Sequence, residues 1–158
     1  MNIIPIQKLQ IKSDYSAKIV AEKLSLETDQ RMFFRKNNSN KKFEGKVHNT
    51  SFNINRILNY RNSFYPIISG KIISEENSKT TIKITMCMTI YANVFMCIWF
   101  IITGTVFIFA LKQQIENEVF EYKPILWSLL FILVGYFLMI ISFTAEAKTA
   151  RKILTEIL

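Results

Sequence analysis

The two longest apolar runs of the chain lie in its C-terminal half. Residues 91–111 read YANVFMCIWFIITGTVFIFAL and residues 124–143 read PILWSLLFILVGYFLMIISF, and neither run contains Asp, Glu, Lys or Arg. At about 1.5 Å per residue, a helix of either length covers the roughly 30 Å of hydrocarbon in a bilayer. Because both runs are apolar on every side, they are typical of membrane spans rather than of core helices. We therefore predict two transmembrane helices joined by a polar link over 112–123.

The first part of residues 1–90 has the pattern of an amphipathic helix. Apolar residues recur there at helical spacing, and Ser13 and Asp14 lie where an N-cap is needed, which predicts a helix over 14–29. The apolar positions are Tyr15, Ile19, Val20 and Leu24.

Four later stretches have the patterns of β-strands: 43–49, 51–58, 64–75 and 81–90. The last of them, TIKITMCMTI, alternates over its whole length and is the clearest strand signal in the chain. A further short strand is expected at 32–34. We predict an α+β domain over 1–90 in which the N-terminal helix covers a four- to five-stranded antiparallel sheet.

The two ends of the hairpin connect differently to the rest of the chain. The strand at 81–90 runs into the first span without a linker, so the β-rich domain is expected to lie at the membrane surface. After the second span, 144–158 keeps a helical pattern and is expected to form a cytosolic helix. Its apolar strip, which has the sheet domain, another copy and the lipid as alternative partners, comprises Ala147, Ala150, Leu154 and Ile157.

The net charge of +8 is unevenly distributed. Most of the basic excess precedes the first span, Lys and Arg also follow the second span, and the link is acidic. The positive-inside rule then places both termini in the cytoplasm and the link outside, in the inner membrane of a bacterium. The N-terminal sequence MNIIPIQKLQIKSDY has no continuous apolar stretch, so we expect no secretory signal there.

No catalytic or metal-binding motif stands out. His48 is the single histidine, and the two cysteines, Cys87 and Cys97, support neither a disulfide framework nor a metal site. Neither span carries a full charge, which disfavours ion translocation by a single copy. The sequence therefore suggests a protein without catalytic residues, metal or cofactor.

A basic group in and after the connector RKNNSNKK is the first candidate binding surface. If the domain is tethered at the membrane, anionic lipid would attract each of these side chains. The alternatives are a solvated basic loop and a nucleic-acid site, and the latter is disfavoured because no stacking motif lies beside the charge. The residues are Arg35, Lys36, Lys41, Lys42 and Lys46.

The stretch RNSFYPIISG is the second candidate. Asn62 and Ser63 are good turn formers, which favours a structural role, and the alternative is a polar ligand site formed by Arg61, Asn62 and Ser63. Together with Phe43, Gly45 and the strand that enters the first span, this stretch resembles small uncharacterised bacterial membrane proteins with a cytoplasmic β-rich domain and two transmembrane helices. The resemblance implies an architecture and no activity.

Small and polar residues in the spans form a predicted packing seam on each helix. Such residues allow close approach of helices in lipid, and each seam serves either the hairpin itself or an oligomer. The seam residues are Asn93, Cys97 and Gly104 on the first span, and Ser128, Gly135 and Ser142 on the second.

Three functional hypotheses follow from these patterns. The leading one is a non-enzymatic integral membrane protein whose cytosolic domain binds a protein partner or anionic lipid. The second is an interfacial lipid-modifying enzyme that uses Arg61, Asn62, Ser63 and His48. The third is a pore or membrane effector that assembles as a homo-oligomer through the small-residue seams.

Overall fold

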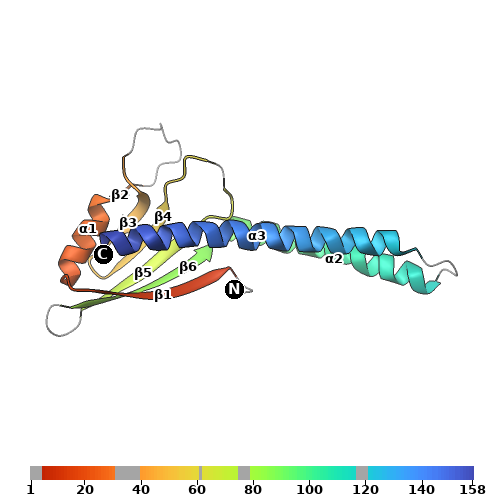
Figure 1. Cartoon of the computed structure of the whole chain (residues 1–158), viewed down its shortest axis with the longest axis horizontal. Coiled ribbons are helices and arrows are strands. Elements are labelled where there is room, and N and C mark those ends of the chain that lie inside the picture. The colour runs from red at the N-terminus through yellow and green to blue at the C-terminus, as the bar shows by residue number, and fades with distance from the viewer. Residues whose placement is uncertain (1–4, 31–39, 61, 75–78, 117–120) are drawn as a thin grey trace. The chain divides into compact units, whose positions relative to one another are not determined.

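The computed structural model describes residues 5–30, 40–60, 62–74, 79–116 and 121–158, and these form an α+β fold (Figure 1). The elements in chain order are β1 (Ile6–Ser13), α1 (Ala17–Leu26), β2 (Thr28–Asp29), β3 (Phe43–Val47), β4 (Ser51–Arg56), β5 (Pro66–Ser74), β6 (Thr80–Met88), α2 (Ile90–Glu116) and α3 (Tyr122–Ile157).

The chain divides into two compact units. The sheet unit comprises Met1–Thr89 and Ser142–Leu158, and the hairpin unit comprises Ile90–Ile141. The helix α3 therefore contributes its first part to the hairpin unit and its last part to the sheet unit, without a break. Both α2 and α3 are long and apolar enough to cross a membrane.

The sheet has six strands in the order β1-β6-β5-β4-β3-β2, and all neighbours are antiparallel except β2 and β3. All four strands expected between residues 43 and 90 are present. The prediction of a purely antiparallel sheet of four or five strands was wrong at both edges. The extra strand β2 lies where the helix was expected to continue, because Thr28 pairs with Phe43 and its hydroxyl donates to Leu24 O (2.6 Å). The strand expected at 32–34 lies outside the described residues.

The strand β1 is the element that the sequence prediction missed. It pairs with β6 along its whole length, from Ile6 opposite Cys87 to Ser13 opposite Thr80. Its polar and apolar residues alternate from Lys8 to Lys12, so the period-two signal was present but short. Because β1 covers the outer edge of β6, β6 is an interior strand. Its alternate residues are accordingly buried: Ile82, Ile84, Met86 and Met88.

The helix α1 is shorter than predicted, and Ser13 does not cap it. The Ser13 hydroxyl instead donates to Leu158 O (2.7 Å) and accepts from the Tyr15 amide (3.3 Å). Ser16 occupies the N-cap position with an extended backbone but makes no side-chain capping bond. On the predicted apolar face, Val20 and Leu24 are fully buried, whereas Tyr15 and Ile19 remain 44% and 43% exposed.

Two helices, rather than one, cover the apolar face of the sheet. The ten residues of α1 extend about 15 Å, whereas six strands extend about 24 Å across a sheet. The C-terminal part of α3 covers the rest and lies along the sheet in Figure 1. Its residues Ala147, Ala150 and Leu154 are fully buried, so docking on the sheet is the alternative that the structure supports.

One glycine in the sheet is required by backbone geometry. Gly45 in β3 has φ of +146°, and a Cβ at this position would lie 2.3 Å from Asn53 O on β4. A side chain cannot be accommodated there without moving one strand away from the other.

Candidate anion-binding surface

Of the five basic residues in the first candidate surface, the structure describes Lys41, Lys42 and Lys46. Lys41 Nζ donates to Thr28 O (3.1 Å), and Lys42 Nζ lies 3.9 Å from Glu27 Oε2. Both lysines therefore contact the segment that follows α1, although both are exposed. They also line a polar pocket of about 350 Å³ together with Arg56. Arg35 and Lys36 lie outside the described residues.

Lys46 lies on a different surface, the face of the sheet that α1 and α3 leave open. Directly opposed residues of neighbouring strands point to the same face, so the strand register identifies the residues of this face. Lys46 is opposite Asn53, which connects across Ser69 and Thr85 to Lys8 on β1. This row of the open face is thus continuous from β3 to β1.

Five exposed lysines share this open face, and we call them the lysine face: Lys8, Lys12, Lys46, Lys71 and Lys83. They come from β1, β3, β5 and β6. The register places two acidic residues on this face, Glu44 on β3 and Asp29, which is opposite it on β2. Basic residues therefore outnumber acidic residues on the open face.

Sequence reasoning found Lys46 but missed the other four lysines. Each of the four occupies a polar position in a period-two pattern, for example Lys83 between Ile82 and Ile84 in β6. Alternation thus predicts that each lysine points away from the core. Alternation does not predict which strands are neighbours. The pairing of β1 with β6 was therefore needed to place these lysines on one surface.

The stretch after β4 is built as a turn. Asn62 Oδ1 accepts a hydrogen bond from the Phe64 amide (2.9 Å), which is the local bond expected of an Asx turn. Ser63 is exposed. These observations support the structural interpretation of Asn62, whereas Arg61 lies outside the described residues.

The described residues contain no group of three or more His, Cys, Asp or Glu side chains placed to hold a metal ion. His48 is exposed in the turn between β3 and β4, where its backbone amide donates to Ser51 O (2.8 Å). Its position is accounted for by the hairpin.

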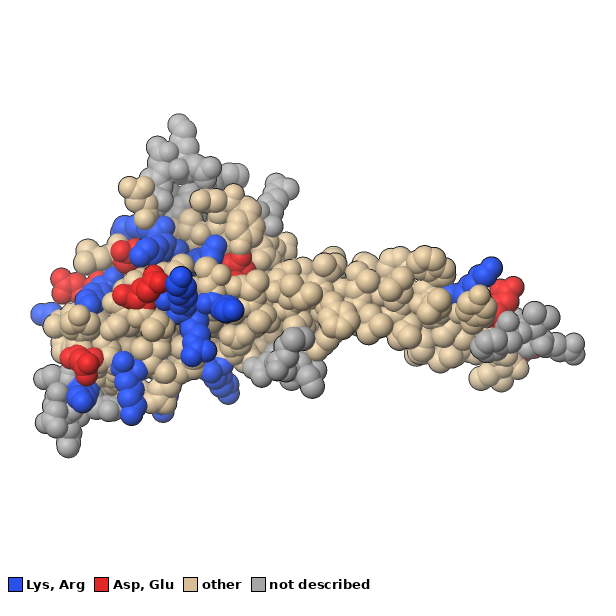
Figure 2. Space-filling view, in the orientation of Figure 1, with Lys and Arg blue, Asp and Glu red and all other residues tan. Residues whose placement is uncertain are grey.

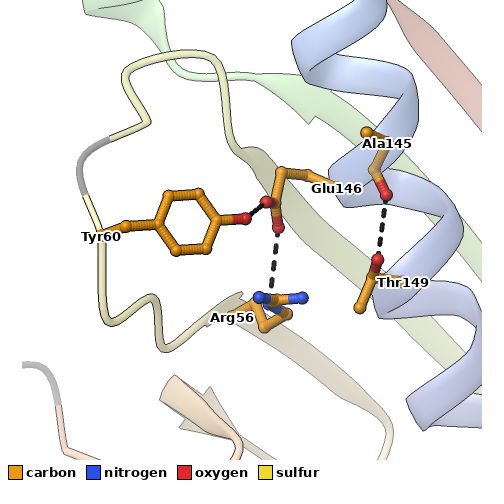
Figure 3. A network of polar contacts seen from close by, with 5 residues as sticks. All are labelled: Arg56, Tyr60, Ala145, Glu146 and Thr149. Atoms are coloured by element: carbon orange, nitrogen blue, oxygen red, sulfur yellow. Dashed lines mark hydrogen bonds and ion pairs between the residues drawn. The ribbon is translucent and has the colours of Figure 1, made fainter.

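A buried polar network connects α3 to the sheet within the sheet unit (Figure 3). Glu146, which is 4% exposed, accepts a hydrogen bond from the Tyr60 hydroxyl, and its Oε2 lies 3.4 Å from Arg56 Nε. The latter contact is an ion pair without hydrogen-bond geometry, because neither atom has a hydrogen-bond partner in the described part of the chain. No sequence signal predicted this network, because Tyr60 and Glu146 are 86 positions apart.

The predicted seams in the hairpin unit differ in their surroundings. On α3, Ser128 and Gly135 are buried, and a Cβ at Gly135 would lie 2.4 Å from the indole Nε1 of Trp99 on α2. On α2, Asn93 and Cys97 are exposed, and a Cβ at Gly104 would meet no atom within 4 Å. Gly135 of the α3 seam thus lies against α2, whereas Gly104 of the α2 seam has no close neighbour. Ser142 is half-buried in the sheet unit.

Comparisons of the chain with protein-family models, curated proteins and solved structures found no match. The resemblance to small bacterial membrane proteins therefore stays an expectation about architecture.

Proposed function

We propose that this chain is a small, non-enzymatic integral membrane protein of a bacterial inner membrane, whose sheet unit is a cytosolic module that binds an anionic partner. The partner is either anionic lipid or an acidic protein surface. In this proposal α2 and the first part of α3 cross the bilayer, and both termini are cytoplasmic.

The observation that carries the proposal is the change of surface along α3. From Tyr122 to Ile141 the helix exposes large apolar side chains along its whole length, including Leu126 (58%), Phe131 (52%) and Leu138 (57%). Only 22% of the most apolar 18-residue stretch of α3 is buried, and only 11% of the corresponding stretch of α2 is buried. On the side that Figure 2 shows, the hairpin unit carries almost no Lys, Arg, Asp or Glu side chains until its loop end. Exposed apolar surface of this extent is expected to contact lipid.

Beyond Ile141 the same helix becomes amphipathic. Its apolar residues are buried against the sheet unit, and its opposite side carries Lys148, Arg151 and Lys152, all exposed. Basic residues just beyond an apolar span favour the cytoplasmic side of a membrane. This pattern supports a water-exposed sheet unit on that side.

The covalent connections support a role at the membrane surface. The strand β6 ends at Met88 and α2 begins at Ile90, so only Thr89 separates the sheet from the apolar helix. One residue adds at most about 3.6 Å of chain. A sheet unit held this close to charged lipid, with an excess of basic residues, is suited to bind anionic groups.

Membrane extraction and cysteine labelling test the proposal. The chain should remain with the membrane after alkaline extraction. In a chain with Cys87→Ser and Cys97→Ser, a cysteine at Glu121 should react with an impermeant maleimide in intact cells, and a cysteine at Asn49 should react only after permeabilisation. Release by alkali, or labelling of position 49 in intact cells, would overturn the proposal.

A homo-oligomeric membrane effector is the second candidate, because a side chain added at Gly104 of the α2 seam would meet no atom of the same chain within 4 Å. Cys97 lies on that seam and is exposed. If copies pack through it, oxidation of a Cys87→Ser chain should form a disulfide-linked dimer in neutral lipid, and Gly104→Leu should prevent it. A Cys87→Ser chain that stays monomeric after oxidation in neutral lipid would reject this candidate.

A further inference from the structure

We infer that the lysine face is the anion-binding site of the sheet unit and that its ligand is the headgroup layer of an anionic phospholipid membrane. This inference rests on the proposed membrane location and deepens it. Among the described surfaces, it assigns lipid recognition to the open side of the sheet rather than to Lys41 and Lys42.

The pairing of Lys71 with Lys83 is the first argument. These residues are directly opposite each other on β5 and β6, so their Cβ atoms lie about 5 Å apart. Like charges in directly opposed positions destabilise a sheet. The other neighbours of this pair in the same row are Gln10 and Ser51, which carry no compensating charge. The pair is therefore unfavourable for the isolated fold, and a bound anion would relieve the repulsion.

The layout of the face is the second argument. Lys8 and Lys46 lie in one row, four strand intervals apart, which corresponds to about 19 Å. Lys8 and Lys12 lie on one strand and are separated by about 13 Å. The side chains between these lysines are small and polar, such as Ser69, Thr85 and Asn53. Charges spread this widely fit a planar array of phosphates better than a single phosphate group.

The residue types on the face distinguish lipid from other anionic macromolecules. Single-stranded nucleic acid is held by stacking on aromatic side chains, and the register places no aromatic residue on this face. Protein interfaces depend on aromatic or Arg anchors and are depleted in Lys. The apolar residues of the face, Ile6, Ile67 and Ile73, lie in its outermost rows rather than at its centre. Diffuse electrostatic attraction by lysines is what a lipid headgroup layer requires.

The test uses the full-length chain in nanodiscs, with an environment-sensitive fluorophore on the lysine face. The chain carries Cys87→Ser, Cys97→Ser and Asn53→Cys, because Asn53 is exposed between Ser69 and Lys46. In discs of phosphatidylcholine with phosphatidylglycerol, the fluorescence should shift to the blue relative to phosphatidylcholine discs. Raising the salt to about 1 M, where the Debye length is about 3 Å, should reverse the shift.

Two variants make the test specific. Gln at positions 8, 12, 71 and 83 should abolish the shift, with a loss of about fivefold in lipid affinity per lysine for the first substitutions. The matched control replaces four lysines elsewhere in the sheet unit, Lys18, Lys41, Lys42 and Lys79, by Gln, and should retain the shift. Equal loss in both variants, or in the control alone, would overturn the assignment.

Additional arms separate the other ligands from a failure of the proposed function. A shift in neutral discs on addition of inorganic phosphate, single-stranded RNA or poly-glutamate, without one in phosphatidylglycerol discs, would overturn lipid as the ligand. No shift under any condition would reject the lysine face as a binding site. In either case the proposed membrane location would stand if the chain still resists alkaline extraction.

Discussion

The two parts of α3 are the same helix with two different surfaces. Before Ile141, large apolar side chains are exposed on several sides, whereas from Ser142 onward Ala147, Ala150 and Leu154 form a buried strip and Ile157 is half-buried. Backbone hydrogen bonding is continuous through the change. The two parts of α3 therefore differ in the pattern of their side chains and not in their secondary structure. That pattern reflects what surrounds each part. In our proposal these surroundings are lipid for the first part, and the sheet and water for the second.

The largest expected effect concerns the ion pair between Arg56 and Glu146, which joins the second part of α3 to the sheet. Glu146→Ala leaves Arg56 partly buried without its partner, which should lower the free energy of unfolding of the sheet unit by about 3 to 5 kcal/mol. Thermal unfolding of the full-length chain in detergent measures this loss. The double substitution Arg56→Met with Glu146→Leu should recover most of it, because a matched apolar pair has no uncompensated charge. No loss in the single variant would show that the network does not hold α3 to the sheet.

The same substitution, Leu to Ala, should have different costs in the two parts of α3. Leu154→Ala removes a fully buried side chain and should cost about 2 to 5 kcal/mol. Leu138→Ala removes one that is 57% exposed and should change stability by less than about 0.5 kcal/mol. Unfolding of both variants in the same detergent provides the measurement. Equal costs would mean that Leu138 is packed against protein.

Within the hairpin unit, the α3 seam can be compared with the α2 seam. Gly135→Leu should be destabilising by about 1 to 3 kcal/mol, because the added side chain overlaps Trp99. Gly104→Leu should be tolerated in the monomer, because open space surrounds that position. Thermal stability of the two variants, followed by Trp fluorescence, distinguishes them. A larger loss at Gly104 would show that α2 packs through its own seam.

The smallest expected effect is a gain in stability, whereas the preceding substitutions should lower stability or leave it unchanged. Lys71→Glu places a carboxylate directly opposite Lys83 and should stabilise the sheet unit by about 0.2 to 1 kcal/mol. If the lysine face binds lipid, the same variant should bind phosphatidylglycerol more weakly. Chemical denaturation and the disc assay measure the two effects separately. A variant that is less stable than the parent chain would remove the argument from like-charge repulsion.

The parts of the fold that sequence predicted are those with long, regular patterns. The ten-residue alternation around β6 and the two apolar runs were sufficient to place the corresponding elements. The two-residue strand β2 had no such signal, because it exists through pairing with β3. Ser13 was expected to cap a helix but binds Leu158, 145 positions away, a contact that local propensity does not contain.

The candidate site was less predictable than the fold for a related reason. A local run of basic residues drew attention to the connector, although Lys41 and Lys42 are occupied by contacts near α1. The lysine face is assembled from strands that are distant in sequence. Its residues were individually visible as polar positions, but only strand order and register bring Lys8 near Lys83 and place Lys71 opposite Lys83.

Accessibility along α3 is the most direct test of the central claim that one helix passes from lipid into water. Single cysteines would replace Leu130, Leu138, Thr149 and Thr155 in a cysteine-free chain held in neutral nanodiscs, and reaction with a charged maleimide would be timed at each position. We expect fast reaction at positions 149 and 155, which are exposed outside the apolar run, and essentially none at positions 130 and 138. Fast reaction at position 130 or 138 would show that the apolar part of α3 is in contact with water and would contradict the account.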